Sequence, residues 1–131
     1  MNHCGTKKLE TKRLILRRFV QSDAEAFYKN WASDPEVTRF LTWPTHTSID
    51  VSKNVLESWL KLYEKEDYYH WVITLKENGN EPIGTIHGQV NDDLELIQIG
   101  YCLGRAWWNK GIMSEAAQAA IDFFFNEVGA N

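Results

Sequence analysis

Hydrophobic residues along this chain recur with two different spacings, and the first is the two-residue alternation that is typical of β-strands. Short polar turns, Glu77-Asn78-Gly79-Asn80 and Asn91-Asp92-Asp93, separate the last alternating segments and predict a meander of hairpins. The segments expected to form strands are Arg13 to Phe19, Tyr69 to Lys76, with Tyr69, Trp71, Ile73 and Leu75 alternating, Pro82 to Val90, and Leu94 to Leu103.

The second spacing, of three and four residues, predicts helices between and after these strands. Ser22 and Glu25 form a capping-box signal for a first helix that should end near Ala32, and Asp34-Pro35 begins a second short helix. A longer amphipathic helix is expected from Ser48 to about Lys65. Its buried stripe should consist of Val51, Val55, Trp59, Leu62 and Tyr63.

A last amphipathic helix follows the third hairpin strand and should end near Val128. Its apolar face is expected to contain Met113, Ala116, Ala117, Ala120, Ile121, Phe124 and Val128. The small alanines on this face favour close packing against a sheet. Residues 1–8 look like a flexible leader. The order β-α-α-β-β-β-α predicts an α+β fold, an α/β sandwich in which helices flank a mostly antiparallel sheet.

Composition excludes several classes of function. The 131 residues are 44% hydrophobic and 24% charged, which is ordinary for one soluble globular domain. A net charge of -4 argues against nucleic-acid binding, and no apolar run is long enough for a membrane span or a signal peptide. Two cysteines, Cys4 and Cys102, suggest no disulfide framework, and the four histidines lack metal-ligand spacing. We therefore expect a cytoplasmic protein without a metal ion.

The segment Gly104 to Ala116, with the sequence GRAWWNKGIMSEA, links the last strand to the last helix. A turn of this kind directs free backbone N–H groups and the positive end of the helix dipole at one point, which suits a phosphate or pyrophosphate. Gly111 allows close approach of the main chain, and Lys110 adds a positive charge. Many strand-to-helix turns with Gly and Lys bind nothing. The sequence contains neither a Walker phosphate loop nor a GxGxxG motif.

Several segments together resemble the GNAT superfamily of acetyl-CoA-dependent N-acetyltransferases, and specifically its ribosomal-protein N-acetyltransferase branch. They are LETKRLILRRF (Leu9 to Phe19), SDAEAF at the first helix, EPIGTI (Glu81 to Ile86), IGYCL (Ile99 to Leu103) and WWNKGIMSEA. The resemblance covers residues 9–131 and implies a GNAT-like fold. It also implies acetyl-CoA as cosubstrate and an amine as acceptor.

By this resemblance, backbone N–H groups from about Asn109 to Ser114 would hold the CoA pyrophosphate. The pantetheine arm would pair with the backbone of Tyr101 to Leu103. The residues implied in cofactor binding are Tyr101, Cys102, Leu103, Trp108, Asn109, Lys110, Gly111, Ile112, Met113 and Ser114. Trp108 replaces the family's Gln or Arg, Asn109 a frequent Gly, and Met113 a Gly or Ala. A buried cysteine is usually inert, which is the expected state of Cys102.

A catalytic base is less easily assigned. Relatives often place a Glu on the strand before the loop, where this chain has Gln98, which accepts no proton. Glu95 and His87 are the nearest alternatives, although strand alternation tends to place Glu95 and Gln98 on opposite faces. All three are retained as catalytic candidates, and each is more often a surface or hydrogen-bonded residue than a base. Residues expected to line the acceptor pocket are Trp31, Trp43 and His46.

The sequence thus favours an N-acetyltransferase that acts on a protein N-terminus or on a small polyamine-like or antibiotic-like amine. The alternative is a non-catalytic module that binds CoA or a partner. Family members continue with further strands beyond the last helix, whereas this sequence ends at Asn131, so the resemblance implies an incomplete domain. We expect an apolar sheet edge, with Phe123 and Phe125 exposed, and a homodimer or larger assembly that covers it, or else poor solubility.

Overall fold

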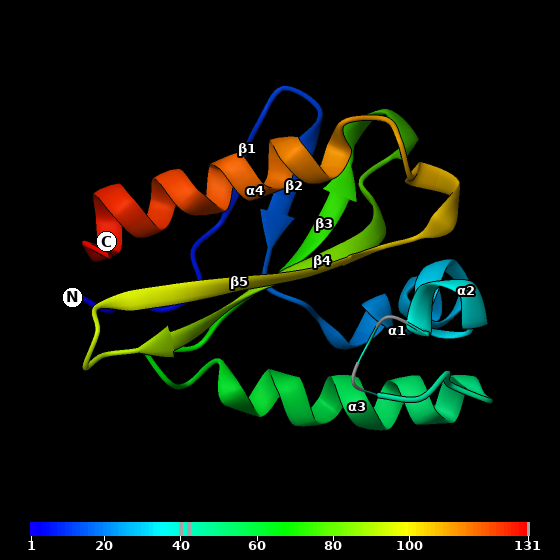
Figure 1. Cartoon of the computed structure of the whole chain (residues 1–131). Helices are drawn as coiled ribbons and strands as arrows, with labels where there is room; N and C mark the ends of the chain where they lie inside the picture. Colours follow the sequence, from blue (N-terminus) through cyan, green and yellow to red (C-terminus); the bar gives the residue numbers. More distant parts are fainter. Residues whose placement is uncertain (40, 42, 131) are drawn as a thin grey trace.

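A five-stranded antiparallel sheet forms the centre of the computed structural model, which describes residues 1–39, 41 and 43–130. The strands lie side by side in chain order (Figure 1). They are β1 (Leu9–Glu10), β2 (Leu14–Arg17), β3 (Tyr69–Leu75), β4 (Glu81–Asn91) and β5 (Leu96–Leu103). The expected fold class, an antiparallel sheet flanked by helices, is confirmed.

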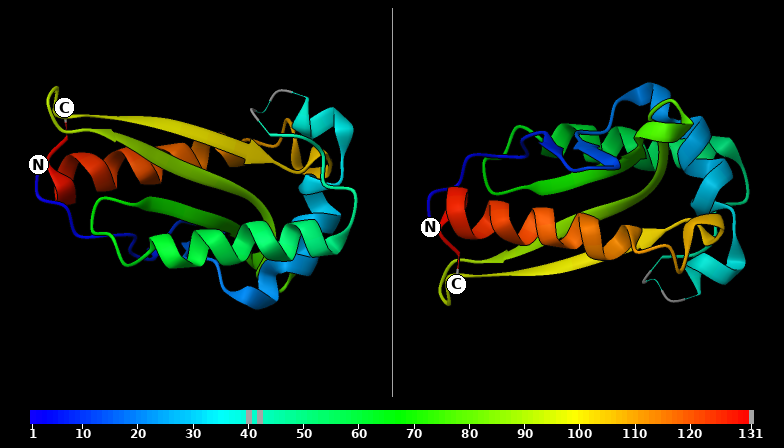
Figure 2. Two further views of the ribbon diagram at one scale, coloured as in Figure 1. Left: turned by 90° about the horizontal axis from the view of Figure 1, so that it is seen from below. Right: turned by 90° about the horizontal axis from the view of Figure 1, so that it is seen from above.

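Helices cover both faces of this sheet. The helix α4 (Ile112–Phe123) crosses one face, and α1 (Ala24–Phe27) and α3 (Ile49–Leu62) lie on the other, as Figure 1 and the two views of Figure 2 show. The short helix α2 (Pro35–Thr38) follows α1, and the Asp34 carboxylate accepts a hydrogen bond from Glu36 N (3.0 Å) at its start. The sheet therefore separates two hydrophobic cores.

Strand β3 is buried along its whole length because a helical layer lies on each side of it. Tyr69, Trp71 and Ile73 pack in the core beneath α4, as their alternation predicts. The polar positions between them are buried as well, and each side chain finds a partner. The Thr74 hydroxyl donates to Ile15 O (2.7 Å), and His70 bonds to residues described below. Alternation in a central strand thus indicates the two faces, but it does not indicate which face meets solvent.

The first helical segment begins earlier than the capping-box signal at Ser22 predicted. The Asp23 carboxylate accepts from Val20 N (2.8 Å) and is held by an ion pair with Arg17 (2.9 Å). Glu25 is exposed and takes no part in this turn. An acidic side chain closer to a strand-borne arginine therefore takes the capping role.

The buried stripes of two helices are rotated by about one residue from the expected ones. In α3 the side chain of Val51 is 37% exposed, because Ser52 turns inward to bond His46 (2.7 Å). After α4 the chain continues in wider, π-helical turns, Phe124–Val128. Such turns hold an extra residue. Phe123, the last residue of α4, and Phe124 both reach the core, while Ile121, within α4, is 46% exposed. The expectation that Phe123 faces water was therefore wrong, whereas Phe125 is exposed.

Residues 1–8, expected to form a flexible leader, are hydrogen-bonded to the rest of the domain in the structure. Asn2 N donates to Val128 O (2.7 Å), Gly5 N donates to Glu66 O (2.7 Å), and Trp71 Nε1 donates to Lys7 O (2.6 Å). The start of the chain consequently lies beside the end of the helical segment that follows α4 (Figure 2). These main-chain bonds involve residues far apart in sequence, so no local pattern indicated them.

Candidate functional site

The turn between β5 and α4 has an unusual backbone that its sequence permits. Asn109 has a φ of 62° and Gly111 a φ of 74°, which are left-handed conformations that Asn and Gly adopt most readily. Gly111 is the N-cap of α4, so the first N–H groups of the helix lie directly after it. These N–H groups have no carbonyl partner within the helix, and they carry the positive end of its dipole.

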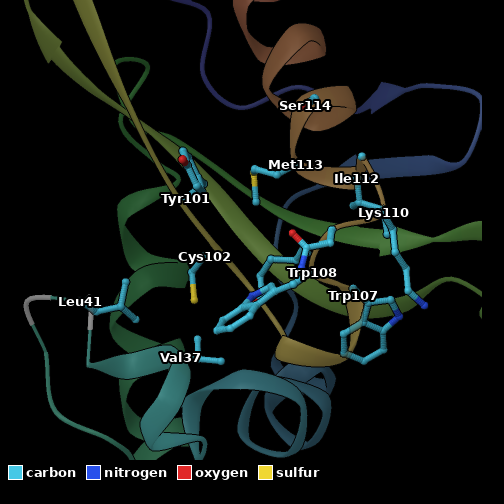
Figure 3. A pocket seen from close by; sticks show the side chains of 13 residues that line it. Val37, Leu41, Tyr101, Cys102, Trp107, Trp108, Lys110, Ile112, Met113 and Ser114 are labelled. Atoms are coloured by element: carbon cyan, nitrogen blue, oxygen red, sulfur yellow. The ribbon is translucent and has the colours of Figure 1, made fainter.

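This turn borders a cavity of about 580 Å³, which we call the loop cavity. The structure brings all ten residues that the resemblance implied in cofactor binding into its wall (Figure 3). The wall consists of Val37, Leu41, Tyr101, Cys102, Leu103, Trp107, Trp108, Asn109, Lys110, Gly111, Ile112, Met113 and Ser114. Lys110 is the one charged side chain among these described residues. The loop cavity thus combines a helix N-terminus and a cation with mostly apolar walls.

The end of β5 presents its main chain to the loop cavity. Gly104 N donates to Ile83 O (2.8 Å), so the main-chain groups of every second residue back from Gly104 point toward β4. Those of Tyr101 and Leu103 consequently point to the open side of the sheet. Trp108 Nε1 donates to Leu103 O (2.8 Å), which anchors the loop to the strand. The Trp108 indole therefore occupies one acceptor that an extended ligand would otherwise use.

An ion pair connects the first turns of α4, just after this loop, to Arg13, which lies between β1 and β2. Glu115, in the first turns of α4, accepts from Arg13 Nε (2.7 Å), from Arg13 N (3.0 Å) and from the Thr11 hydroxyl. Arg13 Nη1 also donates to Lys110 O (2.9 Å). Burial alone would raise the pKa of Glu115, but the hydrogen bonds from Thr11 and Arg13 lower it overall, so the carboxylate stays charged. Arg13 thus neutralises Glu115 beside the helix N-terminus and fixes the Lys110 carbonyl.

A second cavity, of about 560 Å³, lies on the face of the sheet that α3 covers, and we call it the aromatic cavity. It shares Leu41, Tyr101 and Cys102 with the loop cavity, so the two meet at the end of β5. Burial raises the pKa of Cys102 to about 12, so its thiol is protonated. The wall consists of Leu41, Trp43, Trp59, Leu62, Lys65, Asp67, Tyr68, Tyr69, His70, Thr85, His87, Gly88, Gln89, Val90, Tyr101 and Cys102.

Two histidines of the aromatic cavity have different surroundings. His70 is 5% exposed, and its ring nitrogens contact Tyr68 OH (2.8 Å) and Thr85 Oγ1 (2.6 Å). Because the Thr85 hydroxyl donates to Trp71 O, His70 Nε2 donates to Thr85 and Nδ1 accepts from Tyr68. Desolvation, aided by nearby His87, lowers the pKa of His70 to about 3. His70 is therefore neutral, and sequence reasoning gave no signal for it.

His87 is the sequence-predicted catalytic candidate that lies in this cavity. It is paired with Gly100 across the β4–β5 ladder, and a Cβ on Gly100 would overlap the His87 ring. The glycine thus leaves room for the imidazole to lie across β5. Although His87 is exposed to solvent, partial desolvation of its ring lowers its pKa, so the ring is mostly unprotonated at neutral pH. The structure places this potential proton acceptor on the cavity face that also bears Cys102.

The other two candidates lie elsewhere. Glu95 is exposed in the β4–β5 turn with a φ of 54°, and its carboxylate is 3.8 Å from the N-terminal amino group. Six strand residues lie between it and Cys102, which is about 23 Å along an extended chain. Gln98 is exposed opposite Gln89, outside both cavities. Strand alternation was not the deciding factor, because Glu95 precedes the start of β5.

The three residues expected to line the acceptor pocket do not all lie at the aromatic cavity. Trp43 lines the aromatic cavity. Trp31 is fully buried, and its Nε1 has no hydrogen-bond partner among the described residues. His46 is buried against Ser52, and desolvation lowers its pKa. Trp31 and His46 therefore support the cavity from within the core without lining it.

Comparison with known proteins identifies the class of fold and then the family. With a TM-score of 0.79, the structure resembles a GNAT-family acetyltransferase from Bacillus anthracis that is 23% identical, over 95% of this chain and 69% of that one. A putative ribosomal-protein-serine acetyltransferase from Vibrio cholerae gives a TM-score of 0.83 at 18% identity, over 99% and 72%. The sequence matches the acetyltransferase (GNAT) domain over residues 13–131, and the chain belongs to this family.

A curated relative agrees with this assignment. An uncharacterized N-acetyltransferase, p20 of Bacillus licheniformis, is 33% identical over 124 residues, which are 94% of this chain and 68% of the relative. No helix in the described part of the chain has the length and apolar character needed to cross a membrane. Within the same described residues, no three His, Cys, Asp or Glu side chains are grouped to hold a metal ion.

Proposed function

We propose that the protein transfers an acetyl group from acetyl-CoA to an amine. The observation that carries this proposal is the meeting of two cavities at the end of β5, one beside a helix N-terminus and one beside a neutral imidazole. On the GNAT fold these are the features that an acyl donor and an amine acceptor require.

The loop cavity fits a pyrophosphate-bearing donor. The N–H groups after Gly111, the dipole of α4 and the Lys110 ammonium all favour an anion there. The outward main chain of Tyr101 and Leu103 suits an extended amide-bearing arm. Bound acetyl-CoA supplies an activated thioester carbon at the β5 edge.

The aromatic cavity supplies the proton acceptor. An amine attacks the thioester carbon only in its unprotonated form, so a base must accept a proton from the amine nitrogen. His87 is mostly unprotonated at neutral pH and faces this cavity. His70 is fully committed to Tyr68 and Thr85, so it orients its neighbours and takes no proton at this pH. We therefore assign the role of base to His87.

Calorimetry with acetyl-CoA tests the donor site. Gly111→Val places a β-branched residue at a φ of 74°, and it should abolish binding while the fold survives. Lys110→Ala removes one exposed charge and should weaken binding by about 1–2 kcal/mol. If neither Gly111→Val nor Lys110→Ala alters the dissociation constant for acetyl-CoA, the donor binds elsewhere.

Thiol release in the presence of amines separates an enzyme from a binding module. The panel includes peptides with a free N-terminus, because a structural neighbour is named as a putative ribosomal-protein-serine acetyltransferase. Binding of acetyl-CoA without thiol release from any amine would favour the alternative, a non-catalytic CoA-binding module.

A further inference from the structure

We propose that the acceptor is a primary amine that carries one aromatic or bulky aliphatic group and no second cation. This inference rests on the proposed acetyl transfer and concerns the aromatic cavity, whose walls differ from those that a polyamine would need.

The walls of the aromatic cavity are mainly ring faces and aliphatic side chains. Trp43, Trp59 and Tyr68 come from three separate segments and line the same cavity. Aromatic walls of this kind stack on a ligand ring and attract a single ammonium group.

These rings are held in place from behind. The ring centroid of Trp59 lies 5.2 Å from that of Phe27 and 4.6 Å from that of His70. The Tyr68 hydroxyl is hydrogen-bonded to His70, and the ring centroids of Trp43 and His46 are 4.9 Å apart. Because the side chains are already ordered, an apolar ligand group gains contact area without the cost of fixing them.

The charge of the cavity wall distinguishes between the possible acceptor amines. Among the described residues that line the aromatic cavity, Asp67 is the only carboxylate, and Lys65 is the only permanent cation. The wall is therefore close to neutral. A polyamine or an aminoglycoside would bring two or more cations into contact with aromatic walls, where one carboxylate is available to pair with them. An amine with one charge avoids this cost, because its neutral form, which alone attacks the thioester, brings no charge into the cavity.

The position of the aromatic cavity fits this occupant. It reaches Tyr101 and Cys102, where the loop cavity begins, and His87 lies on its wall. An amine whose ring lies among Trp43, Trp59 and Tyr68 has its nitrogen free to approach that junction. The nitrogen then forms the amide bond while the carbon–sulfur bond breaks, one proton goes from the amine to His87, and the thiolate leaves.

The experiment compares 2-phenylethylamine, a phenylalanine-initiated peptide amide, ethanolamine and spermidine in a thiol-release assay with acetyl-CoA. We expect kcat/KM to be at least tenfold higher for the two aromatic amines than for ethanolamine or spermidine. The first two probes distinguish a small amine from a peptide N-terminus. A spermidine value equal to or above that of both aromatic amines would overturn the inference.

A charge change at the cavity rim provides a second test that does not disturb the core. Lys65→Glu replaces the cation of the wall by a carboxylate and should raise the ratio of kcat/KM for spermidine to that for 2-phenylethylamine at least fivefold. Lys61→Glu makes the same charge change on α3, outside the cavity wall, and is the matched control. Equal effects of the two variants on spermidine would show that general surface charge is responsible, and this would contradict the inference.

Direct binding keeps this inference separate from the proposed function. Equilibrium dialysis of 2-phenylethylamine and spermidine against the protein without acetyl-CoA needs no turnover. If acetyl-CoA does not bind, the proposed function fails, and preferential retention of 2-phenylethylamine still supports the assigned ligand class. No preference over spermidine in dialysis would contradict it.

Discussion

The ion pair between Arg13 and Glu115 offers the sharpest test of how the loop is positioned. Arg13→Ala removes the bonds from its guanidinium to Glu115 (2.7 Å) and to Lys110 O (2.9 Å). The Arg13 side chain is 39% exposed, so after solvent screening the pair contributes about 0.5–1 kcal/mol. The carbonyl bond adds about 0.5–1 kcal/mol. We expect a loss of about 1–2 kcal/mol of unfolding free energy.

The effect on binding should exceed what stability alone explains. Without Arg13 the segment from Asn109 to Gly111 loses the bond that holds its middle carbonyl. Refixing the backbone of one residue on binding costs about 1–2 kcal/mol, which is roughly a 5- to 30-fold rise in Kd for acetyl-CoA. Calorimetry with acetyl-CoA measures this rise. S-acetylpantetheine lacks the pyrophosphate, and its affinity should stay within about twofold.

Lys76→Ala is a matched control for the same kind of interaction. Lys76 also bonds a carboxylate, Glu10 (2.7 Å), and a main-chain carbonyl, Thr11 O (2.7 Å), but it lines neither cavity. Its loss removes the same two kinds of bond from the surface and should leave the Kd for acetyl-CoA unchanged. If Arg13→Ala and Lys76→Ala leave the Kd equally unaffected, Arg13 contributes only to stability, and the positioning role is refuted.

Three other expectations concern the sheet. Gly100→Ala displaces the His87 ring and should lower kcat. The Cβ of Gly88→Ala would instead lie 2.6 Å from Phe124 on the other face of the sheet, so this control should spare kcat. Each variant should lower the unfolding free energy by about 1–3 kcal/mol in urea melts. A normal kcat for Gly100→Ala would count against His87 as the base. His70 has a folded pKa of about 3 against 6.5 unfolded, so its stabilisation is complete above pH 6.5 and is lost as the pH falls toward 3, at about 1.4 kcal/mol per pH unit. His70→Asn should flatten this slope between pH 6 and 5, and an unchanged slope would contradict it. The start of β5, with Leu96 44% exposed, should make the purified chain associate in light scattering, and a stable 15.2 kDa monomer with a cooperative melt would argue otherwise.

Local sequence predicted the loop well because its geometry is contained in one short segment. Asn109 and Gly111 permit the left-handed backbone, and α4 begins immediately afterwards, so the N–H groups must converge. The strand before the loop was also predictable, since an apolar alternating run leads into it. Ten of the residues in the wall of the loop cavity were named from this short stretch and its resemblance to the family. The other three are Trp107, which was not named, and Val37 and Leu41, which come from the region of α2.

Contacts between distant segments could not be read from these patterns. Arg13 and Glu115 are 102 residues apart, and nothing in either neighbourhood indicates that they meet. The burial of His70 depends on Trp59 of α3, which packs against its ring, and on Thr85 of the neighbouring strand β4. Within the regular turns of α4 the buried stripe consists of Ile112, Ala116, Ala120 and Phe123, which leaves Ile121 exposed. Local spacing thus predicts elements, whereas the choice of buried face depends on what packs against them.

The position of β5 explains why one short stretch of chain serves both cavities. In a central strand, neighbouring side chains face opposite sides of the sheet, and the flanking strands keep those two sides apart. β5 is the edge strand of the described sheet, so Tyr101 and Cys102 line both cavities although their side chains alternate. A donor arm lying along the outer edge and an amine approaching from the α3 face therefore reach the same point. Any strand that later paired along residues 101–103 would separate them, so acetyl transfer at this site requires β5 to remain open there.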